Sequence, residues 1–226
     1  MHDAVITRLS KEAPETLRDD ILLELVHACN RTGNHGEAYR LMMLHRFVPC
    51  EGGESAVTSR YLEATHAIAR KLYQQGAYED ALGAFETALT LPKNLGAGLW
   101  NDGPAAPSLF GKAMTLCHLG CEDEAKEPLD TILSMKVDFF SDMHQPLLPI
   151  WQARALKALG KENAAETLYL ETVKKFTAEK EKKDSGYFTT TPFFNCYIDP
   201  PTQAREDHYS ALLRDAEFVY HTAFID

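Results

Sequence analysis

Apolar residues recur at helical spacing along most of the chain, in paired segments that are separated by a glycine. In the first segment, Ile21, Leu22, Leu25, Val26 and Cys29 fall on one stripe of a helix. The pattern predicts four antiparallel helical hairpins followed by one more polar helix that caps the stack. The expected helices span 15–31 and 34–46, 57–75 and 78–91, 106–119 and 122–134, 145–159 and 162–182, and 201–222.

Each predicted hairpin carries a glycine that is followed five residues later by an alanine. The pairs are Gly33/Ala38, Gly76/Ala81, Gly120/Ala125 and Gly160/Ala165, with glycine-to-glycine steps of 43, 44 and 40 residues. Self-similarity at such a period is the signature of stacked helical hairpins. We expect the glycine to end the first helix in the left-handed conformation and the alanine to let the two helices approach closely.

The second hairpin resembles the second half of a tetratricopeptide repeat, since Gly76, Tyr78, Ala81, Phe85 and Ala88 occupy the positions at which that family places the same kinds of residue. The resemblance implies an all-α, right-handed superhelix of tetratricopeptide-like hairpins with a C-terminal capping helix. It also implies a protein-interaction or scaffolding module. We therefore expect one solenoid domain over residues 1–226, with repeats at about 15–46, 57–91, 106–134 and 145–182 and the cap at 201–222.

Every repeat exceeds the usual 34 residues by roughly 6–10, and the excess falls in the connections between hairpins. These connections span 46–55, 92–107, 135–149 and 186–201, and equivalent connections leave a solenoid along one edge. They are rich in glycine and in aromatic residues that we expect to be exposed, which favours an interaction surface. We expect this edge and the concave groove to bind a protein or peptide partner, or a second copy of the chain. The candidate binding residues are Arg46, Phe47, Glu51, Glu54, Asn94, Trp100, Tyr187 and Phe188.

The connections also resemble those in the C-terminal repeat region of large bacterial proteins of unknown function. The resemblance is carried by Arg46-Phe47, by the run from Glu51 to Glu54, by Pro92–Gly96 and by Tyr187-Phe188. Those proteins begin with a β-sandwich domain like galactose mutarotase, and we expect no such domain within these 226 residues. A separate sugar-type β-sandwich domain is therefore a further candidate partner. The resemblance also implies an alternative function, a carbohydrate-binding accessory or a cut-down carbohydrate-active enzyme.

Three carboxylates could serve that alternative. Glu51 and Glu54 lie on a glycine turn, and with Asp102 they could act as acid and base on a sugar. The other interpretation is structural, because acidic residues in the first turn of a helix suit the positive end of its dipole. We favour the structural interpretation and assign no catalytic residue, so an enzyme is the less favoured class.

Composition narrows the partner further. The 226-residue chain carries a formal net charge of −10, which argues against nucleic acid and against an anionic membrane surface as partners. No apolar run approaches the roughly 18 residues that a membrane span needs, so we expect a cytoplasmic protein. The five scattered cysteines fit reduced thiols there. No nucleotide-binding fingerprint, GxSxG or HExxH motif occurs, so we expect neither a cofactor nor a metal.

Overall fold

The computed structural model describes residues 2–9, 11–49, 53–98, 103–137, 145–182 and 201–222, and of these it gives no side-chain detail for 54 and 201–204. The described residues form α-helices joined by turns and short 3₁₀ segments, and no strand occurs among them. The chain divides into two compact units, Met1–Met135 and Lys136–Phe224, each of which is treated separately below. Among the described helices, none combines the length and the hydropathy that crossing a bilayer requires.

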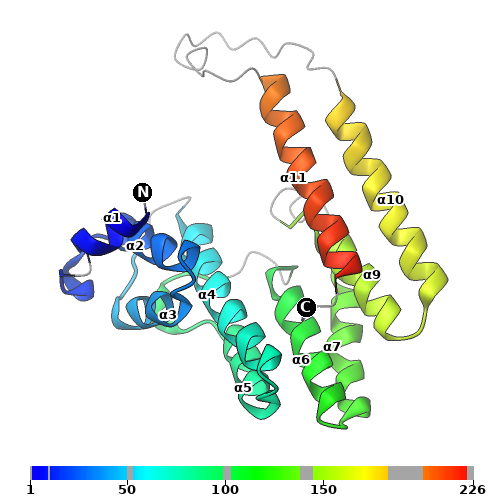
Figure 1. The fold of residues 1–226 in the computed structure, drawn as a ribbon, viewed down its shortest axis with the longest axis horizontal. Helices are drawn as coiled ribbons and strands as arrows, with labels where there is room; N and C mark the ends of the chain where they lie inside the picture. Colours follow the sequence, from blue (N-terminus) through cyan, green and yellow to red (C-terminus); the bar gives the residue numbers. More distant parts are fainter. Residues whose placement is uncertain are drawn as a thin grey trace. The chain divides into compact units, whose positions relative to one another are not determined.

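The first unit is a series of helices in which each packs on the next (Figure 1). Packing also skips one helix, since α2 contacts α4 and α4 contacts α6, so that the first helices of successive hairpins adjoin. The helices are α1 (His2–Leu9), α2 (Asp19–Arg31), α3 (His35–Leu44), α4 (Glu54–Gln74), α5 (Tyr78–Ala88), α6 (Ala106–His118) and α7 (Glu122–Ser134).

The second unit consists of α9 (Leu148–Ala158), α10 (Glu162–Glu181) and α11 (Pro201–His221), which all pack on one another. Figure 1 shows α10 and α11 side by side. The Arg154 guanidinium holds the end of α11 because it donates to the carbonyls of Val219 at 2.7 Å and Thr222 at 2.9 Å. Desolvation lowers the pKa of Arg154 to about 10. A partly buried guanidinium therefore anchors the terminal helix.

All the predicted helices are present, with ends that differ from the predicted ones by a few residues. The first begins at Asp19 rather than at residue 15, because Pro14–Thr16 form a separate 3₁₀ turn. Helix α1 is not predicted by the pattern. It contributes no fully buried residue, and only its partly buried Ile6 and Leu9 pack against the core.

The turn inside each hairpin is the same in all four repeats. The glycines Gly33, Gly76, Gly120 and Gly160 have φ angles of 78°, 75°, 76° and 73°, which confirms the left-handed conformation expected for them. In the first turn, the Asn34 amide donates to the Cys29 carbonyl at 2.8 Å and the Gly33 amide to the Asn30 carbonyl at 3.1 Å. The other three turns repeat both bonds at equivalent positions, which is the Schellman arrangement. The paired alanines are at most 2% exposed, as expected.

A second glycine role appears where α5 meets α6. The Phe85 side chain is fully buried, and its ring lies directly over Gly111 of α6. A Cβ on Gly111 would come within 2.3 Å of that ring. The missing side chain at Gly111 therefore gives the aromatic ring its space, and the two hairpins pack in direct contact at this point.

Candidate functional site

A cleft of about 480 Å³ lies in the first unit, between the first turns of α2 and α4. The segment that leaves α3 forms its third wall. Its floor is apolar, and the charged residues among its described lining come from the start of α2. The cleft therefore lies where the first helices of two successive hairpins meet the first connection. The lining residues are Arg18, Asp19, Asp20, Leu23, Val48, Pro49, Gly53, Ala56 and Val57.

Asp19 fixes one wall of the cleft. One of its carboxylate oxygens, Oδ1, lies 2.7 Å from His45 Nε2, and the other, Oδ2, accepts a hydrogen bond from the Val48 amide at 2.8 Å. Asp19 is also well placed in the first turn of α2, where a negative charge suits the helix dipole. One carboxylate thus joins the start of α2 to the segment that follows α3.

His45 completes this connection from inside the fold. The side chain is buried, with 5% of the residue exposed, and its Nδ1 lies 2.9 Å from the Pro14 carbonyl. Both ring nitrogens therefore face oxygen atoms, a backbone carbonyl and a carboxylate. The Phe47 ring meets the His45 ring edge-on with centroids 4.6 Å apart. The wall is held by polar bonds on one side and by aromatic packing on the other.

The second connection holds the first in place. The side-chain nitrogen of Asn94, Nδ2, donates to the backbone carbonyls of Met42 and His45, both at 2.8 Å. The backbone carbonyl of Asn94 accepts a hydrogen bond from the backbone amide of Phe47 at 2.8 Å. Gly96 then turns the chain with a φ of 63°, so close to Phe47 that a Cβ would lie 2.4 Å from the Phe47 carbonyl oxygen. The first two connections therefore meet, as expected of connections on one edge. We call these contacts of Asn94 and Gly96 the loop clasp.

Three of the candidate binding residues are fully described. Arg46 is exposed beside the clasp. The expectation that Phe47 is an exposed aromatic is wrong, because only 2% of it is exposed and its side chain belongs to the first unit's core. Asn94 is partly buried, and its side-chain nitrogen bonds to the two carbonyls at the end of α3. Through these contacts, Phe47 and Asn94 hold the segment after α3 that forms one wall of the cleft.

The other candidates stay predictions. The backbone of Glu54 begins α4 beside the cleft, where the structural interpretation placed it, but its side chain is outside the description. Four more candidates, and Asp102 of the carbohydrate alternative, lie outside the described residues. They are Glu51, Trp100, Tyr187 and Phe188.

An exposed ion pair between Arg18 and Asp20, at the start of α2, forms the charged rim of the cleft. Arg18 donates to both carboxylate oxygens of Asp20, from Nε at 3.1 Å and from a terminal nitrogen at 2.8 Å. The two side chains are 78% and 63% exposed, so solvent screens the pair and it contributes roughly 0–1 kcal/mol. Both groups therefore remain accessible to an incoming partner.

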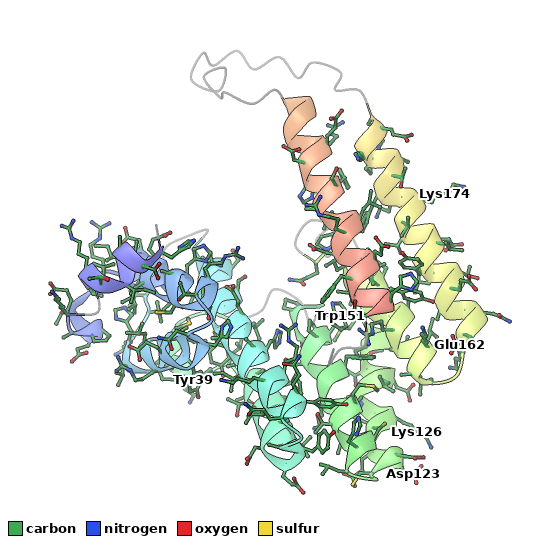
Figure 2. All side chains as sticks on the ribbon, in the orientation of Figure 1. Tyr39, Asp123, Lys126, Trp151, Glu162 and Lys174 are labelled. Atoms are coloured by element: carbon green, nitrogen blue, oxygen red, sulfur yellow. The ribbon has the colours of Figure 1, made fainter. Side chains whose placement is uncertain are left out.

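A smaller hollow of about 200 Å³ lies between α3, α4 and α5, lined by Tyr39, Thr65, Ile68, Ala84 and Thr87. Figure 2 labels Tyr39. Near it, the buried Tyr61 hydroxyl points at the carbonyls of Thr87 and Thr90, at 2.9 and 3.0 Å. Burial raises the pKa of Tyr61 to about 12, so this hydroxyl stays neutral. Among its described lining residues, the smaller hollow holds no acidic or basic side chain beside its hydroxyl groups.

The described lining of the cleft is mainly apolar, with charged groups at one end. Among the described residues that line it, no serine, threonine, cysteine or tyrosine accompanies the Asp19–His45 pair, so this described part holds no nucleophile next to a base. Within the described ranges, no three His, Cys, Asp or Glu side chains gather as a metal ion would require. An apolar floor with a few polar groups at the rim is typical of a site that recognises a partner.

Asp19, His45 and Val48 were not among the sequence candidates. One signal could have pointed to His45, which stands twelve residues after Gly33, where the tetratricopeptide-like repeat has Ala88. A titratable side chain at a core position needs a buried partner. Comparison with models of known protein families finds no family that matches this chain, and comparison with solved structures finds no match either.

Proposed function

We propose that this chain is a protein-interaction module of the tetratricopeptide type. In this proposal its hairpins continue one another as a right-handed superhelix, and the cleft between α2 and α4 receives an apolar segment of a protein partner. The repeated turns support this architecture, since each of the four hairpins is closed by an equivalent Schellman turn. A separate β-sandwich domain of the sugar-binding type stays one candidate source of the segment.

The observation that carries the proposal is the apolar floor of the cleft, open to solvent between the first helices of two hairpins. Leaving the partly exposed Leu23 and the exposed Ala56 open to solvent at this cleft costs hydrophobic free energy that a bound side chain would recover. The walls are preorganised by Asp19 and by the loop clasp. A preformed site binds with less loss of conformational entropy than one that must order on binding.

The test selects peptides from a displayed random library on the full chain and then compares two variants. Ala56→Arg places a long side chain in the cleft from an exposed position of α4. Ser59→Arg adds the same charge one turn along the helix, at an exposed residue that does not line the cleft. Because arginine is a good helix former, both variants should fold.

We expect the selected peptides to be rich in apolar residues and to lose at least about tenfold in affinity for Ala56→Arg, measured by fluorescence anisotropy. Their affinity for Ser59→Arg should match that for the unsubstituted chain. The proposal fails if no sequence is enriched, or if the enriched peptides bind both variants equally well.

A further inference from the structure

The cleft has an apolar projection on its own rim. Val48 lines the cleft and yet is 78% exposed, which makes it the most exposed large apolar residue described. Its backbone is fixed, because the Val48 amide donates to Asp19 and the residue on its other side is Pro49. A β-branched side chain on a fixed backbone has few rotamers to lose when it is buried. Val48 is therefore a preorganised apolar knob next to an apolar hollow.

A knob and a hollow on one patch are self-complementary. When two copies face each other across a two-fold axis, the knob of each enters the hollow of the other, and both contacts form at once. A partner with only a projecting apolar segment would fill the cleft but would leave its own face opposite Val48 unmatched. The shape of the patch thus favours a second copy of this chain as the occupant.

The charges at the rim agree with this geometry. Arg18 and Asp20 carry opposite charges two residues apart, and both side chains are largely exposed. In a two-fold pair, Arg18 of one copy can meet the partner's Asp20, while Asp20 meets the partner's Arg18. A strongly basic or strongly acidic partner would be attracted by one of these groups and repelled by the other. Two copies that each carry a net charge of −10 repel elsewhere, so the exposed Arg18–Asp20 pair, which carries both signs, marks where they can approach.

We infer that the cleft is the centre of a two-fold homodimer interface in which Val48 enters the partner's cleft and the Arg18–Asp20 pairs exchange partners. This inference rests on the proposed function, since it names the protein that the cleft binds. A contact built on one knob, one hollow and one charge pair per copy is smaller than a standard interface, so the dimer forms reversibly with concentration.

The first experiment is sedimentation velocity on the full chain from about 1 μM to about 500 μM, a range in which small interfaces dissociate. The unsubstituted chain should shift from monomer to dimer. Val48→Asp, a change at an exposed position, should weaken the dimer at least about tenfold. Leu170→Asp is the matched control, because Leu170 is also an exposed apolar residue, at 54%, but lies on α10 in the other unit.

A charge exchange gives a test that does not depend on Val48. Arg18→Asp gives a rim with acidic groups only, and Asp20→Arg gives a rim with basic groups only. Each variant should remain monomeric when alone, because like charges would face each other. A mixture of the two should form a heterodimer, visible by native mass spectrometry because the masses differ.

Each remaining outcome counts against the dimer. A chain that stays monomeric at every concentration overturns this inference. A dimer that Val48→Asp does not weaken overturns it too, and so does a mixture of Arg18→Asp and Asp20→Arg that forms no heterodimer. The proposed function is judged separately, because a monomeric chain that binds selected peptides in an Ala56-dependent way still has a protein-binding cleft. If the chain neither dimerises through this cleft nor binds selected peptides there, both proposals are wrong.

Discussion

Substitution of Gly96 by alanine tests whether the loop clasp holds the wall of the cleft. Gly96 is left-handed at φ 63°, a conformation that costs a residue with a Cβ about 1–2 kcal/mol. The new Cβ would also lie 2.4 Å from the Phe47 carbonyl oxygen, whereas ordinary contacts begin at 3.4 Å. The two segments must therefore separate by about 1 Å, which removes the strain only by moving the backbone.

That separation breaks the bond that now joins the Phe47 amide to the Asn94 carbonyl at 2.8 Å. Loss of one such hydrogen bond costs about 1 kcal/mol, so the free energy of unfolding of the Gly96→Ala chain should be lower by about 2–3 kcal/mol. For a chain of this size the corresponding fall in melting temperature is about 5–12 °C. Because Val48 and Pro49 follow directly, cleft-dependent peptide binding should weaken too.

The matched control lies two residues further along the same loop. Gly98 is outside the left-handed region, and a Cβ there meets nothing within 4 Å. Gly98→Ala should leave the melting temperature unchanged or raise it slightly, because alanine lowers the entropy of the unfolded chain. Thermal melts followed by far-ultraviolet circular dichroism compare the two variants. Equal melting temperatures, within about 2 °C, would refute the reasoning on the clasp.

Two further predictions concern the helices. Gly111→Ala should lower the free energy of unfolding in urea by about 1–3 kcal/mol, because its Cβ would lie 2.3 Å from the Phe85 ring. The control Gly83→Ala, in open space on α5, should raise this free energy by about 0.5–1 kcal/mol. A loss of stability in both variants would contradict the packing argument. Burial lowers the pKa of His66 from 6.5 to about 4, so folding favours the neutral ring. The contribution of His66 to the free energy of unfolding is constant above pH 6.5 and falls by about 2–3 kcal/mol as the pH drops toward 4. In this range His66 binds a proton in the unfolded chain but stays neutral in the folded chain. His66→Leu should flatten this part of the unfolding profile, and an unchanged profile would show that other groups produce it.

The helices and their turns were predictable because the signals are local. The 3.6-residue apolar spacing and the repeated glycines act within one hairpin, and Gly33 shows the expected left-handed turn. Helix α1 was missed for a related reason. With Ile6 and Leu9 only partly buried, its sequence carries too few strongly apolar positions to form a clear stripe.

The cleft could be predicted only in part, since its walls depend on contacts between distant residues. Asp19 meets His45 across 26 residues, and Asn94 reaches the Met42 carbonyl across 52. No local pattern announces such bonds. Phe47 was misjudged from its place in a connection. A period-two alternation does run through this segment, because His45 and Phe47 are buried while Arg46 and Val48 are exposed.

The loop clasp has a consequence for anyone who would transplant this edge onto another helical scaffold. The stretch after α3 keeps its course because Asn94 and Gly96, from one hairpin later, brace it. A graft of residues 45–49 alone would therefore lack these contacts and would not keep its conformation. Both loops, although far apart in the sequence, must be transplanted together.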